Sequence, residues 1–246
     1  MTQSGRFVWA ELFTTKKEAA LEFYGELLGW SIKEMPMGDF NYTMFSAGDT
    51  GVGGVGGADV NESQWLLYLT VDDVDAKTKQ ALSAGAQPYM PPTDIPTVGR
   101  FSVIIDPQGA AVALFKPASD MPESAMPKLG EFCWHELMVP DAQKACDFYG
   151  PLVGWTTNAV PMGPMTYYLQ LSGEKQRAGV MQTPAEMEVP PYWMPYVLVE
   201  NVDKTAQHAE KLGGQILIPA TDIPNIGRFV VVMAPDGSVL APFQGA

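Results

Sequence analysis

Apolar and polar positions alternate near the start of the chain and then recur with a helical period. Residues 7–13 alternate as a strand does. The segment Thr15-Lys16-Lys17-Glu18 then has the pattern of a capping box, and Gly29 is placed to end the helix that follows. One apolar stripe at spacings of three and four residues is formed by Ala20, Phe23, Tyr24, Leu27 and Leu28. The pattern therefore predicts a strand followed by a helix.

Shorter extended segments follow, and the order of strand and helix then begins again. The turn Asp106-Pro107-Gln108-Gly109 lies between the last two expected strands, and Gly85 ends the expected second helix. The elements expected here are strands near 42–46 and 52–55, a strand over 66–71, a helix over 73–84, and strands over 101–105 and 111–115. We therefore predict two successive modules of a strand, a helix and further strands.

The whole pattern occurs twice. The matching segments are Phe7–Leu12 and Phe132–Leu137, Phe23-Tyr24-Gly25 and Phe148-Tyr149-Gly150, Gly29-Trp30 and Gly154-Trp155, and Gly99-Arg100-Phe101 and Gly227-Arg228-Phe229. We predict one domain over residues 1–117, a second copy over residues 131–246, and a linker over residues 118–130 that is rich in Pro, Met and Ser. The chain then holds four modules.

Composition and charge exclude several kinds of partner. The chain has 15 Lys and Arg against 28 Asp and Glu, so its formal net charge of −13 disfavours binding to nucleic acid. No apolar run approaches the roughly 20 residues that span a bilayer, and the N-terminus lacks the pattern of a secretory signal. Cys133 and Cys146 form no CxxC motif. We expect free thiols, a cytoplasmic location, and neither nucleic acid nor a membrane as partner.

The order of motifs resembles a known family. A helix with Phe-Tyr followed by Gly-Trp, and later the turn Asp-Pro-Gln-Gly, are similar to the glyoxalase/bleomycin-resistance/extradiol-dioxygenase group, the vicinal oxygen chelate superfamily. Trp-x-Glu-Leu, the Pro-Met-Gly loops and Asp-Ile-Pro-x-x-Gly-Arg-Phe are similar to two-domain glyoxalase-like proteins of the kind found in actinobacteria. The resemblance implies an α+β fold in which four βαβββ modules form two cup-shaped open barrels, with the helices outside and the site inside.

The resemblance also implies where members with a divalent metal bind it. Tryptophan, leucine and alanine cannot serve as ligands for such an ion. The fourth ligand would fall within residues 41–48 or 166–173, which contain no His, Asp or Glu. The other implied positions are Trp9 and Trp134, Leu66 and Met194, and Ala113 and Ala241. We therefore expect no metal and no other cofactor.

Strand alternation predicts an acid among aromatic side chains inside each cup. If Trp9 faces inward, Glu11 and Phe13 do so as well. Glu11 and Glu136 are the candidate catalytic acids, because a carboxyl group in apolar surroundings has a raised pKa. The candidate ligand-binding residues are Trp9, Phe13, Tyr42, Tyr68, Arg100, Trp134, Met138, Tyr167, Tyr196 and Arg228. Such a lining suits a small apolar or aromatic molecule.

Each of these assignments has a structural alternative. Aromatic strand residues often belong to the core, and Glu11 could form an ion pair with an arginine such as Arg100. Asp94 and Arg100, repeated as Asp222 and Arg228, could fix a loop instead of meeting an anionic ligand.

Three further motifs are interpreted as structural. Gly51–Gly56 matches the GxGxxG pattern, but no helix follows it, so we expect no dinucleotide site. His135 is expected to face away from the cup as a hydrogen-bonded structural histidine. Cys146 lies beside Asp147, which disfavours a thiolate nucleophile.

Two classes of function fit these residues. The first is a metal-independent protein that binds a small molecule, in the manner of bleomycin-resistance proteins. The second is an enzyme, a lyase, isomerase or hydroxylase, in which Glu11 and Glu136 act as acid–base groups with Tyr68 or Tyr196 as partner. A metal-dependent glyoxalase or dioxygenase is a third alternative, and a protein–protein role a fourth. The chain is expected to be a monomer with pseudo-dimeric repeats or a homodimer.

Overall fold

The computed structural model describes residues 4–38, 40–57, 62–123, 126–163, 165–184, 186–187 and 189–246. The first repeat contains β1 (Phe7–Thr14), α1 (Lys17–Leu28), β2 (Ser31–Met37), β3 (Phe40–Ala47), β4 (Thr50–Gly57), β5 (Gln64–Thr70), α2 (Val74–Ser83), β6 (Gln87–Ile95), β7 (Gly99–Ile105) and β8 (Ala111–Pro117). The second contains β9 (Phe132–Val139), α3 (Ala142–Val153), β10 (Thr156–Met162), β11 (Met165–Ser172), β12 (Lys175–Gln182), β13 (Tyr192–Leu198), α4 (Val202–Lys211), β14 (Gln215–Ile223), β15 (Gly227–Met233) and β16 (Val239–Gly245). Each repeat therefore consists of two βαβββ modules, as predicted.

The strands of a module share one order. The first modules run β2-β3-β4-β1 and β10-β11-β12-β9, and the second modules run β5-β8-β7-β6 and β13-β16-β15-β14. In each, the first strand is parallel to the last one, as β1 is to β4, and the remaining pairs are antiparallel. The result is an α+β fold built from two similar curled sheets, with the helices packed on one face of the strands.

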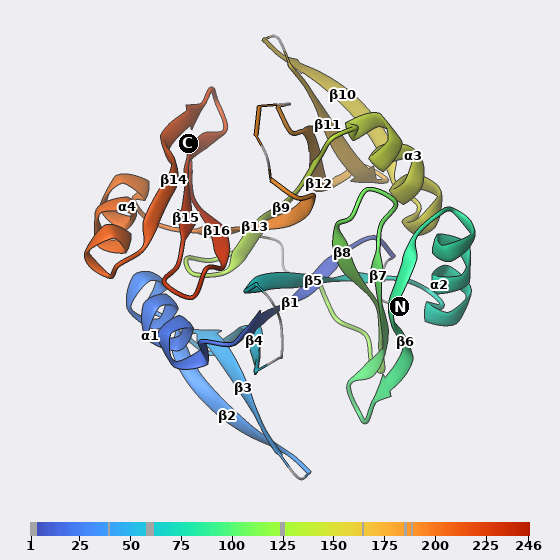
Figure 1. Cartoon of the computed structure of the whole chain (residues 1–246), viewed down its shortest axis with the longest axis horizontal. Coiled ribbons are helices and arrows are strands. Elements are labelled where there is room, and N and C mark those ends of the chain that lie inside the picture. The colour runs from blue at the N-terminus through green and yellow to red at the C-terminus, as the bar shows by residue number, and fades with distance from the viewer. Residues whose placement is uncertain are drawn as a thin grey trace. The chain divides into compact units, whose positions relative to one another are not determined.

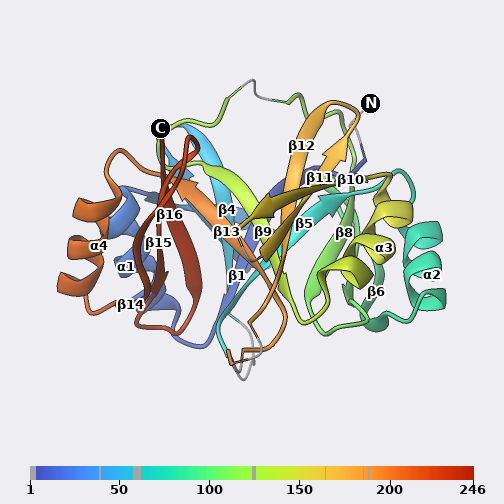
Figure 2. The ribbon, with the colours of Figure 1, turned by 90° about the horizontal axis from the view of Figure 1, so that it is seen from above.

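The chain divides into two compact units, and each unit combines modules from both repeats. Unit 1 consists of Met1–Val8, Leu67–Ser124 and Trp134–Trp193, whereas unit 2 consists of Trp9–Leu66, Ala125–Cys133 and Met194–Ala246. Unit 1 thus contains α2 beside α3, and unit 2 contains α1 beside α4 (Figures 1 and 2). The curled sheets follow the repeats instead: β1 neighbours β5 in one eight-stranded sheet and β9 neighbours β13 in the other, so each cup is built from the two modules of one repeat.

A helix tyrosine joins the two modules within each unit. In unit 1 the hydroxyl of Tyr149 donates to Oδ2 of Asp106 at 3.0 Å, and both side chains are buried. In unit 2 the hydroxyl of Tyr24 is hydrogen-bonded to Oγ of Ser238 at 2.7 Å. The Phe-Tyr motif of one repeat therefore meets the Pro-x-Gly turn of the other, and this contact specifies which modules pair.

The Gly-Trp motif places a second large side chain in each unit. The indole of Trp30 donates to the carbonyl oxygen of Gly130 at 2.7 Å, and that of Trp155 to the carbonyl oxygen of Gly5 at 2.9 Å. Both tryptophans are buried among aromatic rings. The motif therefore fixes the chain segments that enter and leave each module.

One local prediction needs correction. Thr15 does not form a capping box, because α1 begins after Lys16, which makes no side-chain cap; instead, Oγ1 of Thr14 accepts from the amide of Lys16 at 3.0 Å. Gly29 does end this helix, with φ +67°.

The edge strands β2 and β6 were absent from the predicted elements. Their side chains are exposed along most of their length, so no apolar alternation marks them in the sequence. None of the helices in the described ranges is long and apolar enough to cross a bilayer.

Candidate functional site

Three side chains from the strands of unit 2 form a hydrogen-bonded cluster. The hydroxyl of Tyr42 on β3 donates to Oε2 of Glu11 on β1 at 2.5 Å. The indole Nε1 of Trp9 lies 3.2 Å from the same carboxyl oxygen and 3.0 Å from the hydroxyl of Tyr42. Trp9 and Glu11 thus share one face of β1, as strand alternation predicts. We call this set the Trp–Glu–Tyr cluster of unit 2.

Glycines on β4 make room for this cluster. Gly54 lies opposite Glu11 and Gly56 lies opposite Phe13 in the parallel ladder. A Cβ atom on Gly54 would collide with the hydroxyl of Tyr42 and with Oε2 of Glu11. The glycine-rich segment that matches a dinucleotide motif therefore leaves space for the side chains of the cluster. Only the pairing of β1 with β4 reveals this role.

Unit 1 repeats the cluster with Trp134, Glu136 and Tyr167. The indole of Trp134 donates to the hydroxyl of Tyr167 at 2.9 Å, and that hydroxyl is hydrogen-bonded to Glu136. Gly179 lies opposite Glu136, and a Cβ atom on it would collide with the ring of Tyr167. The two cups therefore share one arrangement of acid, phenol and indole.

The acid of unit 2 is buried, and its pKa is raised. Glu11 is 6% exposed, and burial raises the pKa of its carboxyl group, although the hydrogen bonds from Tyr42 and Trp9 oppose this in part. Both hydrogen bonds end on Oε2, and Oε1 accepts none from the described residues. Trp9 and Tyr42 are only half-buried. Oε1 of Glu11 is thus the carboxyl oxygen left for a ligand, beside half-buried aromatic rings.

The phenol of unit 1 stays protonated. Burial and the nearby charge of Glu136 both raise the pKa of Tyr167 far above its usual value. The same two causes raise the pKa of Tyr192, which the sequence analysis did not select. Tyr192 therefore lies within electrostatic reach of Glu136.

The tyrosines of the second modules pack on phenylalanines. Tyr68 lies 5.8 Å, between ring centroids, from both Phe101 and Phe115. Tyr196 makes the corresponding contacts with Phe229 and Phe243, at 6.0 and 6.5 Å. Both tyrosines are buried. They form an aromatic wall, whereas Tyr42 and Tyr167 are the phenols shown to bond to the acids.

The arginines selected from the sequence lie in ion pairs on the helix side. Arg100 binds both carboxyl oxygens of Asp75 on α2, at 2.7 and 2.9 Å, and Oδ1 of Asp94 at 2.9 Å. Its neighbour Ser102 is hydrogen-bonded to Thr78 of α2, so this face of β7 is the helix face. The pairing holds the strand to the helix and agrees with the loop-fixing alternative.

Arg228 repeats this arrangement in unit 2, with Asp203 and Asp222. The suggested ion pair between Glu11 and an arginine such as Arg100 is wrong, because Glu11 accepts from Tyr42 and Trp9.

The surroundings of His135 and of the two cysteines do not activate their side chains. The imidazole of His135 packs on Phe7 with ring centroids 4.4 Å apart, and burial lowers its pKa to about 3. Cys133 and Cys146 are free thiols. Burial raises the pKa of Cys133 to about 12 and also raises that of Cys146. Neither thiol is therefore activated as a nucleophile.

The side chains at the cluster do not fit a divalent metal. The indole nitrogen of Trp9, at the first implied ligand position, is a hydrogen-bond donor only. Ala113 and Ala241 are buried methyl groups at the last one. No group of three or more His, Cys, Asp or Glu within the described part of the chain could hold a metal ion. One carboxyl and one phenol per cup do not make such a site.

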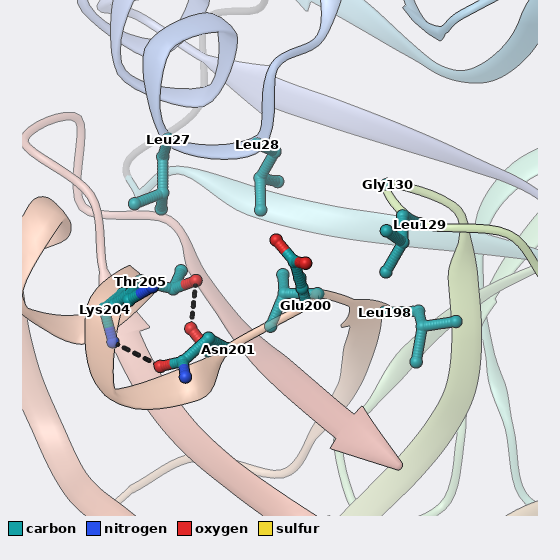
Figure 3. A pocket seen from close by; sticks show the side chains of 10 residues that line it. Leu27, Leu28, Leu129, Gly130, Leu198, Glu200, Asn201, Lys204 and Thr205 are labelled. Atoms are coloured by element: carbon teal, nitrogen blue, oxygen red, sulfur yellow. Dashed lines mark hydrogen bonds between the residues drawn. The ribbon is translucent and has the colours of Figure 1, made fainter.

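A separate groove of about 250 Å³ lies in unit 2 between the end of α1 and the start of α4 (Figure 3). On the polar side of this groove, the side chain of Asn201 accepts a hydrogen bond from the amide of Lys204 at 2.9 Å and so caps α4. The lining residues are Leu27, Leu28, Leu129, Gly130, Leu198, Val199, Glu200, Asn201, Lys204 and Thr205. None of them belongs to the Trp–Glu–Tyr cluster.

Solved structures of other proteins have the same fold. A 2,2',3-trihydroxybiphenyl 1,2-dioxygenase from Sphingomonas wittichii strain RW1 superposes with a TM-score of 0.68 at 12% identity, over 99% of this chain and 91% of its own. An Mn(II)-bound glyoxalase from Novosphingobium aromaticivorans gives 0.65 at 16% identity, over 99% of this chain and 83% of its own. At such identities the similarity concerns the fold alone.

Sequence comparison identifies the family of this chain. CFP32 of Mycobacterium tuberculosis, whose name includes the word glyoxylase, is 32% identical over 97% of this chain and 94% of its own length. The anthracycline biosynthesis protein DnrV of Streptomyces peucetius is 27% identical over 95% of this chain and 91% of its own. The family described as the Glyoxalase/Bleomycin resistance protein/Dioxygenase superfamily matches residues 6–114 and 130–241. The chain therefore belongs to the glyoxalase/bleomycin resistance protein/dioxygenase superfamily, with one family domain in each repeat.

Proposed function

We propose that this protein binds a small, mostly aromatic molecule within a cup, beside the acid cluster, without the help of a metal. The observation that carries the proposal is the Trp–Glu–Tyr cluster of unit 2, in which Oε2 of Glu11 receives both hydrogen bonds and Oε1 receives none from the described residues. A neutral carboxyl group at this place donates its proton to a ligand oxygen, while the half-buried rings of Trp9 and Tyr42 contact the ligand's apolar surface.

The ligand chemistry follows from these groups. A hydrogen-bond donor between aromatic walls favours a carbonyl or hydroxyl oxygen on a flat ring system. The name of DnrV links that relative to the biosynthesis of anthracyclines, which are fused-ring quinones. A hydroxylated quinone is therefore the class of ligand that we propose. The free, unactivated thiols agree with the cytoplasmic location expected from the sequence.

Binding to 1,4-dihydroxyanthraquinone tests the proposal. This probe is uncharged, so the net charge of −13 does not attract it unspecifically. Native mass spectrometry of the full chain, with and without EDTA, should show the chain plus unaltered probe in both conditions. Absence of the complex, or its loss with EDTA, would contradict the proposal.

Variants of Glu11 separate the binding protein from an enzyme. A glutamine retains an acceptor for Tyr42 and Trp9 and donates an N–H to the ligand, so Glu11→Gln should bind the probe within about threefold of the wild type. Glu11→Ala removes the donor and should weaken binding about tenfold, the equivalent of about 1.4 kcal/mol.

The second candidate function is acid–base catalysis, which the raised pKa of Glu11 favours. In that case the double variant Glu11→Gln with Glu136→Gln should keep its fold and lose turnover, because an amide cannot transfer the proton. A double variant that converts substrate at the wild-type rate would exclude this candidate.

A further inference from the structure

The two cups differ in the residues that lie beside the acid of each. In unit 2, β4 places Gly56 opposite Phe13 of β1. In unit 1, β12 places Met181 opposite Met138 of β9. Gly56 and Met181 lie two residues beyond the glycines that make room for the clusters, so they face the same way. One cup therefore carries a methionine where the other has no side chain.

Burial follows this difference. Glu11 and Glu136 are both 6% exposed, and Trp9 and Trp134 are both half-buried. At the next inward position, Phe13 is half-buried whereas Met138 is only 6% exposed. The cups are thus alike at the acid, and they differ where Gly56 is replaced by Met181.

A second position adds to this asymmetry. The start of β13 supplies Tyr192. The next residue, Trp193, donates to Tyr149 of α3 and so faces the helix, which turns Tyr192 to the opposite, inner face of the strand. The charge of Glu136 raises the pKa of Tyr192, in agreement with this placement. The corresponding first residue of β5 is Gln64, which is exposed. The two strands correspond because Trp65 and Trp193 follow these residues. Unit 1 therefore has two large side chains near its acid that unit 2 lacks.

Gly56 also lies near the oxygen that is left for a ligand. A Cβ atom on Gly56 would be 3.1 Å from the ring of Phe13 and 3.6 Å from Oε1 of Glu11. A flat ring over Gly56 would contact the edge of Phe13 and bring an oxygen substituent to Oε1. A methionine at this place occupies the same volume.

We propose that the cup of the first repeat, which holds Glu11, accepts a fused-ring aromatic ligand, and that Met181 and Tyr192 exclude the same ligand from the cup of the second repeat. This inference rests on the proposed function and adds the residues that set the size of the ligand. The full chain should consequently bind one molecule of such a ligand, although it contains two acid clusters.

Exchanging residues between the cups tests this inference. Native mass spectrometry with 1,4-dihydroxyanthraquinone should show one probe per wild-type chain. Gly56→Met should weaken its binding by about tenfold or more, the loss expected when the space for a ring is filled. Met181→Gly combined with Tyr192→Gln should admit a second probe. Gly56→Ala, with thermal unfolding of every variant, controls for damage to the fold.

The outcomes separate the inference from the proposed function. Two probes on the wild-type chain, unchanged binding by Gly56→Met, or no second probe on the variant Met181→Gly with Tyr192→Gln would overturn the inference. In these cases loss of binding in Glu11→Ala would still support the proposed function. No binding to the wild type or to any variant would overturn both.

Discussion

At the scale of single residues, the molecule places a buried acid within a small hydrogen-bonded cluster. Glu11 receives a phenol and an indole on one oxygen and has a raised pKa because burial outweighs both hydrogen bonds. This balance connects the acid to stability as well as to binding.

The raised pKa predicts a specific dependence of stability on pH. Between the unfolded value of 4.5 and the higher folded value, the native state binds more protons than the unfolded state. The contribution of Glu11 to the free energy of unfolding is therefore full below pH 4.5 and decreases as the pH rises through the folded pKa, with a slope of at most about 1.4 kcal/mol per pH unit.

Urea unfolding of the wild type and of Glu11→Gln between pH 4 and 8 measures this contribution. The difference between them should change in favour of the variant as the pH rises, because glutamine does not ionise. A difference that stays constant across this range would show that the pKa of Glu11 is not raised.

Gly54 provides a second prediction at this scale. Gly54→Ala should displace the hydroxyl of Tyr42, destabilise the protein by about 1–3 kcal/mol and weaken binding of the probe. Gly245→Ala is the matched control, since a Cβ atom there would have no neighbour within 4 Å. Denaturant midpoints and probe titrations of both variants check the prediction, and equal stability would contradict it.

At the scale of elements, helix tyrosines join modules from different repeats. The two joints are not chemically equal: Tyr149 donates to the carboxylate of Asp106, while Tyr24 meets the hydroxyl of Ser238. In both joints a buried indole, from Trp193 or Trp65, donates to the phenol. The joints therefore differ chiefly in the charge of one partner.

Removal of each hydroxyl should reveal this difference. Tyr149→Phe leaves Oδ2 of Asp106 without its phenol and should cost about 1.5–3 kcal/mol, because hydrogen bonds to charged groups are the stronger ones. Tyr24→Phe should cost about 0.5–1.5 kcal/mol, since its partner is a neutral hydroxyl. Chemical denaturation of both variants provides the comparison, and the reverse order of costs would refute the argument.

At the scale of the whole molecule, the repeat in sequence and the compact unit in space are different divisions. Each unit takes one module from each repeat, whereas each eight-stranded curled sheet, and therefore each cup, is built from the two modules of one repeat. A single repeat therefore retains its sheet but leaves its helices without their partners, α1 without α4 and α2 without α3.

A fragment of residues 1–117 should accordingly assemble as a dimer, in which a second copy covers α1 and α2 as the second repeat does in the full chain. Light scattering after size-exclusion chromatography would give its mass. The full-length protein is the control for both units. A folded, monomeric fragment would mean that one repeat is stable without a second repeat against its helices.

The sequence by itself determined the modules, their duplication and the face of β1 that carries Trp9 and Glu11. These features are local, because strand alternation, the helical stripe of α1 and its terminating Gly29 depend on neighbours in the chain. The edge strands β2 and β6 left no such signal, because they bury no continuous face.

Only the tertiary structure decided the contacts between distant segments. Three such contacts depend on which strands and helices become neighbours. They are the hydrogen bond of Tyr149 to Asp106, the close approach of Gly54 to Tyr42 and the ion pair of Arg100 with Asp75. Periodicity along one chain segment carries no information on such neighbours, because it specifies which face of an element is buried but not against what. The difference between Gly56 and Met181 can likewise be interpreted only from the strand register, which places each residue beside its acid.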